Sequence, residues 1–440
     1  MLIQKADRKW ETRPLECWNK AKQLRADFYT KEATAKEEKM WLVEGGGGAT
    51  TAGIGNCHVV FCNPLGASIA AEGDRFAREC RGATEMRGYG RDIGGYILDA
   101  LGAMFSNRGL RGAEYHKRDF VLGNAGCDMH RKHTQVVAEY YGIPFFFSDS
   151  IGYYGEEDAE RDEARMEFLV NQQLEEIEWL EKTTGKKFDD EAFIENAKSG
   201  MRLQAYKADT MLYQQHIPAP LDQKTIYSLF ILGGLVRTDQ FSTEQFWKEL
   251  RDEVKWRTEN NIAAVATERF RFVESEPPPW FFLRYYRYME EYGAVCIGSP
   301  YSHGVQLIQQ PDGTWTRSKT ALEQGIPLNT REDFLRLQMF GRSGSHGGAG
   351  HGPVHEQYQE PVLNMIQAYH CDGAILPLYR SGVGCVWGHR ELAVKLEELG
   401  IPVMHYETSH PGNHTDFDEN RMLDQLDTFM ETQGLRKLEE

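Results

Sequence analysis

Short apolar runs alternate with helical patterns in two separate stretches of this chain, and this alternation limits the possible folds more than any other feature. The runs of the first stretch are 57–62, 119–123 and 143–147, and those of the second are 293–297, 374–378 and 401–405. Buried apolar strands separated by helices are typical of a parallel sheet that is covered on both faces. The sequence therefore predicts an α/β protein with two Rossmann-like lobes, which could be structural echoes of each other.

Glycine and proline clusters divide the chain further. A charged helical segment from about residue 14 to 39 precedes four consecutive glycines at 45–48, which disfavour regular structure. Three prolines at 277–279 exclude a continuous helix and follow a long helical stretch. We therefore expect an N-terminal helical segment (1–45), a first α/β lobe (46–155), a helical region (156–270) and a second α/β lobe (271–440).

Charge and hydropathy exclude two classes of partner. The 440 residues include 50 Lys and Arg against 66 Asp and Glu, a net charge of −16, and no basic stripe that would bind nucleic acid. The longest apolar run, near 229–236, contains two glycines and is far shorter than the ~20 residues that span a bilayer. The N-terminus has no apolar signal-peptide core, which favours a cytoplasmic protein with reduced cysteines.

The common catalytic motifs are missing from the sequence. There is no dinucleotide or Walker-type glycine loop, no zincin motif, no nucleophile elbow and no C-x-x-C pair. Binding sites of open α/β sheets form at the carboxyl ends of strands. Cys127 and Cys385 are the cysteines that follow predicted strands in glycine-containing loops, one in each lobe. Their spacing leaves open an iron–sulfur cluster with fewer than four protein thiolates, a reactive cysteine pair, or simple burial.

Several motifs occur in the order seen in one family. They are Tyr89–Tyr96, Gly126–Asp128, Pro144 with Asp149, Glu276–Trp280, Gly293–Val295, Asp372-Gly373, Cys385 and Gly400–Val403. Over about 14–440 the chain resembles the 2-hydroxyacyl-CoA dehydratase and benzoyl-CoA reductase family. Its terminal segments are most similar to the larger of the two cluster-bearing subunits of ATP-dependent benzoyl-CoA reductase.

The resemblance implies a [4Fe-4S] cluster between the lobes, held by three cysteines. Two of these positions match Cys127 and Cys385, whereas the third falls on Gly94. Cys80 is the nearest upstream thiol and is the first candidate to replace it. The alternatives are a ligand that is not a thiol, or a cluster that is altered or absent.

The resemblance also implies a reaction and its partners. The complex would take electrons from ferredoxin, use ATP on separate activator subunits, and reduce benzoyl-CoA to a cyclohexadiene carboxyl-CoA together with a paralogous cluster-bearing subunit. The alternatives are a subunit of a radical 2-hydroxyacyl-CoA dehydratase, and a non-catalytic scaffold subunit paired with a cluster-bearing paralogue.

Side chains for protonation and for substrate binding are expected mainly in the second lobe. The reduced ring needs a proton donor, and the candidates are His303, His346, His351 and His355, because they lie in loops of that lobe. Arg342 and Arg390 are candidates for contact with the CoA phosphates. The aromatic residues at 280–288 fit a core or a subunit interface better than an aryl pocket.

Overall fold

The structure is a computed structural model of the chain. It describes residues 9–45, 49–124, 128–149, 158–230, 232–235, 238–275, 277–303, 305–342, 354–380, 388–408 and 417–439.

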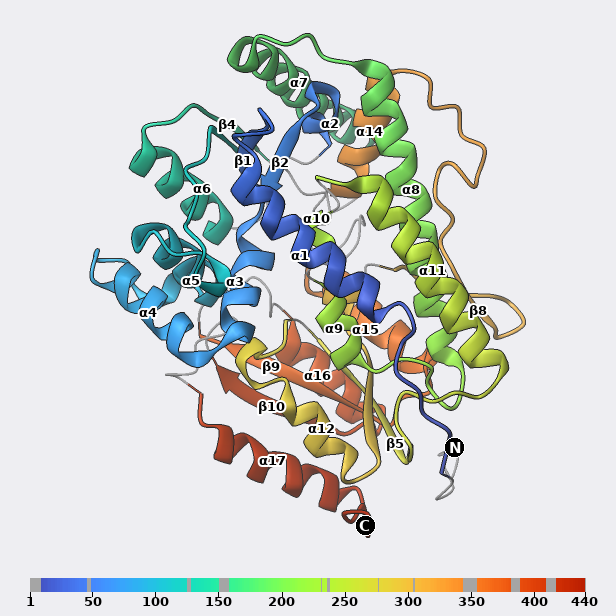
Figure 1. The fold of residues 1–440 in the computed structure, drawn as a ribbon. Helices are drawn as coiled ribbons and strands as arrows, with labels where there is room; N and C mark the ends of the chain where they lie inside the picture. The colour runs from blue at the N-terminus through green and yellow to red at the C-terminus, as the bar shows by residue number, and fades with distance from the viewer. Residues whose placement is uncertain are drawn as a thin grey trace.

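Two four-stranded parallel sheets form the centres of two lobes, which confirms the predicted fold class (Figure 1). The strand order is β2-β1-β3-β4 in the first sheet and β6-β5-β9-β10 in the second, so both follow the same pattern of second, first, third and fourth strand. The strands of the first sheet are β1 (Trp41–Gly45), β2 (Cys57–Val60), β3 (Phe120–Asn124) and β4 (Phe145–Ser148). Those of the second are β5 (Phe270–Glu274), β6 (Ala294–Gly298), β9 (Gly373–Tyr379) and β10 (Val403–Thr408), and a hairpin adds β7 (Leu307–Gln309) and β8 (Trp315–Arg317).

Helices cover both faces of each sheet, because side chains of successive strand residues point to opposite sides. In β3, Phe120 and Leu122 join the apolar cluster under α7, whereas Val121 joins the cluster under α5 and α6. The helical elements of the first lobe are α2 (Thr50–Ile54), α3 (Cys62–Glu72), α4 (Asp74–Glu85), η1 (Arg91–Ile93), α5 (Gly95–Phe105), η2 (Leu110–Gly112) and α6 (Asp128–Tyr141). Those of the second are η4 (Trp280–Phe282), α12 (Arg284–Glu290), α13 (Pro300–His303), α14 (Arg331–Arg342), α15 (Val354–Ala368), α16 (His389–Glu398) and α17 (Glu419–Thr432).

The predicted helical region between the lobes is present, and α8 and α11 run side by side along one edge of the molecule (Figure 1). Its elements are α7 (Ala159–Thr184), α8 (Asp190–Leu212), η3 (Tyr213–Gln215), α9 (Gln223–Phe230), α10 (Leu232–Leu235) and α11 (Gln240–Glu259). The expected N-terminal helix is α1 (Trp18–Thr34), which crosses the front of the molecule between the lobes in Figure 1.

The first predicted boundary, at residue 45, would separate an inner strand of the first sheet from the rest of that sheet. Trp41–Gly45 pairs with both β2 and β3 and therefore belongs to the first lobe. Gly45, the first of the four glycines that suggested a break, is the last residue of this strand. Glycine is needed there because the backbone of β3 passes very close to it. A Cβ atom on Gly45 would lie 1.9 Å from the carbonyl oxygen of Leu122.

Two further differences concern the second lobe. Strand β5 is a central strand without a strong sequence signal, because Arg271 and Glu274 interrupt its apolar pattern although both are buried. The segment that ends in α14 leaves the second lobe and packs against α7 and α8 of the helical region, where Phe334 and Leu335 join the apolar cluster of the first sheet. A boundary in sequence is therefore not a boundary in space.

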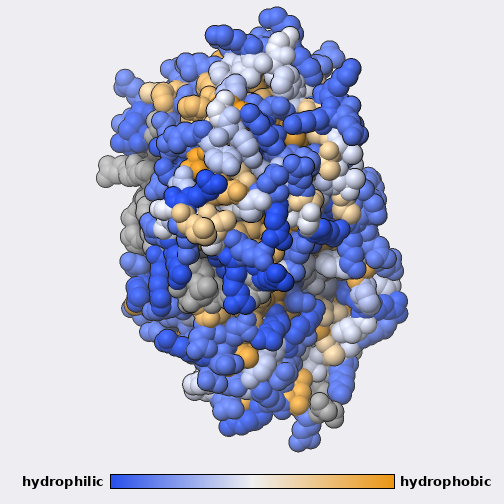
Figure 2. Space-filling model, turned by 60° about the vertical axis from the view of Figure 1, so that its left-hand side comes forward, coloured by the Kyte–Doolittle hydropathy of each residue, from blue (hydrophilic) through white to orange (hydrophobic). Residues whose placement is uncertain are grey.

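The described surface is largely polar. Hydrophilic residues predominate on the face shown in Figure 2, where hydrophobic residues form small, separate groups. Within the described ranges, no helix is both long and apolar enough to cross a membrane.

Candidate functional site

The structure describes the surroundings of the predicted ligands better than the ligands themselves. Cys127, Cys385, His346 and His351 lie outside the described residues. His303 is the last residue of α13 and His355 is in the first turn of α15, but their side chains are not among those described. The predicted roles of these six residues therefore remain predictions, and the geometry comes from their neighbours.

Strand β3 ends at Asn124, three residues before Cys127, and helix α6 begins at Asp128, directly after it. From the first turn of this helix, the Nε2 atom of His130 lies 2.6 Å from Oδ1 of Asn63. Asn63 is the second residue of α3, directly after β2 and Phe61. The first turns of α3 and α6, the helices that follow β2 and β3, are thus held together at the carboxyl edge of the first sheet.

The corresponding edge of the second sheet contains a buried histidine. His389 begins α16, and its Nδ1 donates a hydrogen bond to the carbonyl of Pro377 at 2.8 Å. Its Nε2 lies 2.9 Å from the hydroxyl of Ser275, which directly follows β5. Burial lowers the pKa of His389 to about 4, so that the imidazole is neutral near pH 7 and its Nε2 accepts the Ser275 proton.

The segment that should carry the third cluster ligand lies where the two lobes meet. Gly94 precedes α5 with φ of +89°, a conformation that L-residues rarely adopt. Two residues later, the buried hydroxyl of Tyr96 accepts a hydrogen bond from the indole N–H of Trp280. It also lies 3.0 Å from the hydroxyl of Tyr301. We call Tyr96, Trp280 and Tyr301 the interlobe junction.

Cys80 lies inside the first lobe and not at this junction. Its side chain is fully buried in the apolar cluster shared by α4 and α5, and burial strongly raises the pKa of its thiol. A Cβ atom on Gly102 would meet the Cys80 carbonyl oxygen at 1.9 Å. Gly102 is eight residues after Gly94, roughly 12 Å along the helix. This position is that of a packing residue, and it does not favour Cys80 as a cluster ligand.

We tested whether the described side chains fit a metal cluster. Within the described ranges, no group of three or more His, Cys, Asp and Glu side chains is arranged to hold a metal ion. Position 94 supplies no thiol, and Cys80 packs elsewhere. Neither Gly94 nor Cys80 therefore provides the third thiolate that the resemblance implies.

The most unusual polar group of the second lobe was missed by the sequence analysis. Glu274, the last residue of β5, is fully buried. Its carboxylate accepts hydrogen bonds from the hydroxyls of Tyr285 and Tyr286, and from Tyr406 at 3.0 Å. We call these four residues the Glu274 cluster. Burial raises the pKa of Glu274 to about 7, although the three phenols oppose this shift.

The same edge of the sheet contains a polar cavity of about 210 Å³, at the carboxyl ends of β9 and β10. Tyr406 is among the residues that line this cavity and also binds Glu274, so the cluster adjoins the cavity at this residue. A single glutamate before a proline run was the sole sequence signal for this cluster. The tyrosines come from 285–286 and 406, and only the fold brings them together.

The predicted aromatic stretch belongs largely to the core. Trp280, Phe282, Tyr285 and Tyr286 are buried in one apolar cluster that also includes Ala67, Ala70 and Tyr96 of the first lobe. This cluster joins the two lobes and excludes water from the junction. Arg390 is exposed on α16, and the side chain of Arg342 lies outside those described.

Comparisons with known proteins agree with the expected family. Residues 73–432 match the family model of the 2-hydroxyglutaryl-CoA dehydratase D-component. The chain is 24% identical over 391 residues to the (R)-phenyllactyl-CoA dehydratase alpha subunit of Clostridium sporogenes, covering 87% of this chain and 86% of that protein. It is 25% identical over 256 residues to the (R)-2-hydroxyisocaproyl-CoA dehydratase alpha subunit of Clostridioides difficile, covering 57% of this chain and 60% of that protein. The matched residues begin at α4 of the first lobe, end in α17 and include all three junction residues, and the chain therefore belongs to the 2-hydroxyglutaryl-CoA dehydratase D-component family.

Proposed function

We propose that this chain is a catalytic subunit of an ATP-dependent, ferredoxin-linked enzyme that reduces benzoyl-CoA, or a substituted analogue, to a cyclohexadiene carboxyl-CoA. The interlobe junction is the observation that carries this proposal. Two motifs of the resemblance, Tyr89–Tyr96 and Glu276–Trp280, are far apart in sequence. The hydroxyl of Tyr96 nevertheless accepts a hydrogen bond from Trp280, 184 residues away. A water-poor apolar cluster surrounds this contact, as a strongly reducing reaction requires.

The chemistry explains why such a scaffold is suitable. The reaction adds two electrons and two protons to the aromatic ring, and the thioester carbonyl helps by delocalising the first added electron. A bound [4Fe-4S] cluster would supply low-potential electrons, with Cys127 and Cys385 as its proposed thiolates. Because neither Gly94 nor Cys80 supplies a third thiolate, we assign no reaction step to a cluster in this chain.

Protons for the reduced ring have two proposed sources. His303, His346, His351 and His355 remain candidate donors in the second lobe. The Glu274 cluster supports an additional source, because a carboxyl with a pKa of about 7 can hold a proton near neutral pH. Tyr406 connects that carboxyl to the polar cavity.

A radical dehydratase of 2-hydroxyacyl-CoA is the second candidate, and the names of the two relatives favour it. This reaction recycles its electron, so each ATP-driven activation supports many turnovers. Both relatives are alpha subunits, which supports a partner subunit for this chain in either case. The third possibility is a scaffold subunit that supports a cluster-bearing paralogue, as Gly94 would permit.

Turnover with defined ATP separates the first two candidates. The chain, its partner subunit and the activator are supplied with reduced ferredoxin and either benzoyl-CoA or (R)-2-hydroxyacyl-CoA. A reductase consumes ATP in proportion to the diene that it forms. Dehydration with only catalytic ATP would exclude the reductase and support the dehydratase.

Iron and sulfide analysis of the anaerobically isolated chain tests the scaffold alternative. We expect iron in the wild-type chain and its loss in Cys127→Ser and Cys385→Ser, whereas Cys80→Ser should retain it because Cys80 lies in the core. A folded wild-type chain without iron would favour the scaffold.

A further inference from the structure

A cavity of about 230 Å³ lies where α1, α3, α9, α10 and the segment from Trp280 to Leu283 meet. It is therefore bordered by the N-terminal helix, the first lobe, the helical region and the second lobe. The junction residue Trp280 forms part of its wall. The cavity thus adjoins the interlobe junction, at a place where the sequence predicted no site.

The cavity is positively charged although the chain as a whole is acidic. Lys22 and Arg25 lie three positions apart on α1, so both extend from the same face of the helix. The Nε atom of Arg25 is buried and has no hydrogen-bond partner among the described residues. None of the described lining residues is acidic, in a protein with a net charge of −16. These two cations therefore suit an anion from outside the chain.

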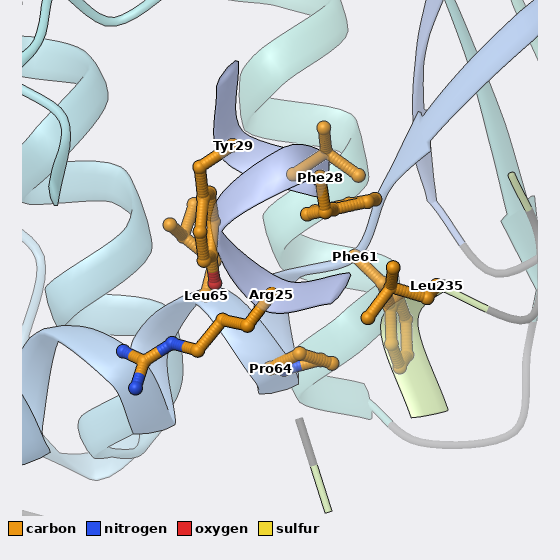
Figure 3. A pocket seen from close by; sticks show the side chains of 8 residues that line it. Arg25, Phe28, Tyr29, Phe61, Pro64, Leu65 and Leu235 are labelled. Carbon is orange, nitrogen blue, oxygen red and sulfur yellow. The ribbon is translucent and has the colours of Figure 1, made fainter. Parts of the chain in front are cut away.

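Arg25 also borders a small apolar cavity next to the first one. Figure 3 shows its side chain extending away from the rings of Phe28 and Phe61, which line that small cavity with Leu235. The small cavity, at about 10 Å³, has room for a water molecule at most. The larger cavity is therefore the one in which the guanidinium can meet a ligand.

Aromatic rings form the other part of the wall. Trp18, Tyr227 and Trp280 line the cavity, and the rings of Tyr227 and Trp280 are in edge-to-face contact at 5.5 Å. Small residues of α3, including Ala71, leave space opposite them. At about 230 Å³ this cavity is many times larger than the small one beside it, which leaves room for a ring system with a phosphate.

We infer that this cavity binds the nucleotide end of a coenzyme A thioester. Aromatic side chains stack on a purine, and a guanidinium and an ammonium bind phosphate. The inference rests on the proposed function only in taking a CoA thioester as the substrate. The nucleotide would be held at α1, and the remainder of the thioester would extend toward the junction.

Equilibrium dialysis of the full chain tests this inference without turnover. The probes are adenosine 3′,5′-bisphosphate, CoA, dephospho-CoA and ATP. Arg25→Gln should weaken binding of the bisphosphate and of CoA about tenfold, and Lys22→Gln combined with Arg25→Gln should weaken it further, because charged hydrogen bonds are lost. Lys36→Gln removes one exposed charge just after α1 and is the matched control, with unchanged affinity expected.

A cavity-filling variant separates this site from general charge attraction. Ala71 is exposed at the cavity wall, so Ala71→Phe can occupy the space while both cations remain. It should also weaken CoA binding about tenfold. Equal affinity of the wild type and all three cavity variants for CoA would overturn the inference, as would tighter binding of ATP than of CoA with the same dependence on Arg25.

The inferred CoA site and the proposed function can each fail without the other. If CoA binds through Arg25 but neither acyl-CoA substrate reacts, the proposed function fails and the site stands. If benzoyl-CoA is reduced with an unchanged KM in Arg25→Gln, the site is wrong and the proposed function stands.

Discussion

The two lobes share their strand order and each buries a glutamate on its first strand, but the partners of the two carboxyls differ. In the first lobe, Glu44 is the penultimate residue of β1, and in the second, Glu274 is the last residue of β5. Both carboxyls are buried, and burial raises the pKa of each to about 7. The two lobes therefore bury the same chemical group at closely similar places in one topology.

The partners of these carboxyls differ. Glu44 accepts a hydrogen bond from Nε of Arg118 at 3.1 Å, and the same guanidinium binds Glu32 at 2.6 Å. His133 is near Glu44, but burial lowers its pKa to about 3, so it is neutral and forms no ion pair. Glu274, in contrast, has three phenols as its partners and no cation among them.

This difference shows how one fold can use a buried carboxyl in two ways. A carboxylate compensated by arginine is a structural ion pair, whose loss leaves an uncompensated charge. A carboxyl held by neutral hydroxyls can gain or lose a proton near neutral pH. The first lobe therefore holds its buried carboxyl in an ion-pair network with Arg118, and the second holds it among neutral phenols alone.

The largest effect is expected from breaking the charge network of the first lobe. Arg118→Met removes the fully buried guanidinium between Glu44 and Glu32, and should lower the free energy of unfolding by about 3–5 kcal/mol. Urea unfolding measures this change. Arg131→Met is the control, because its ion pair with Asp149 is about half exposed and should contribute less than about 1 kcal/mol. Similar losses in both variants would contradict the distinction.

In the second lobe, Glu274 should make the free energy of unfolding depend on pH. The pKa of Glu274 is raised from about 4.3 in an unfolded chain to about 7, so the folded state binds the proton more tightly. Its stabilising contribution is complete below about pH 4 and is lost as the pH rises through 7, by roughly 3 kcal/mol. Glu274→Gln removes this pH-dependent contribution to the free energy of unfolding.

Urea unfolding of both proteins between pH 5 and 8 checks this prediction. The wild type should lose stability relative to Glu274→Gln as the pH rises, whereas Glu398→Gln, at an exposed position of α16, should follow the wild type. Parallel curves for wild type and Glu274→Gln would show that Glu274 does not titrate in this range.

A smaller effect is expected where the lobes touch. Tyr96→Phe removes the acceptor of the Trp280 N–H and the partner of the Tyr301 hydroxyl, and should cost about 1–2 kcal/mol. If the junction couples the lobes, unfolding followed by near-ultraviolet circular dichroism should also become less cooperative. Unchanged stability would mean that apolar packing alone joins them. Tyr140→Phe, at an exposed position, is the control.

The smallest effect should come from removing a single phenol of the Glu274 cluster. Tyr406→Phe deletes the hydrogen bond of 3.0 Å but leaves those of Tyr285 and Tyr286. It should cost about 1 kcal/mol and raise the pKa of Glu274 further, because one donor that stabilises the carboxylate is gone. The midpoint of the pH-dependent loss should therefore move upward, and a downward shift would contradict the cluster.

Local patterns were sufficient for much of the architecture. The helical region expected from residue 156 onward begins with α7, an amphipathic helix in which Leu169, Ile177 and Leu180 are buried on one face. The apolar runs at 119–123 and 374–378 became β3 and β9 for the same reason. Strands β1 and β5 were missed because Glu44, Arg271 and Glu274 read as surface residues. Their partners come from distant segments, so their burial has no local signal.

The sequence by itself determined the alternation of strands and helices, the two lobes and the family, because these depend on local periodicity and on the order of motifs along the chain. Only the tertiary structure decided what each polar residue meets. It placed Cys80 in the core, Tyr96 against Trp280, three tyrosines around Glu274, and Lys22 with Arg25 at a cavity. Burial and charge compensation depend on contacts between segments that folding alone brings together, and these contacts decide whether a polar side chain is structural or reactive.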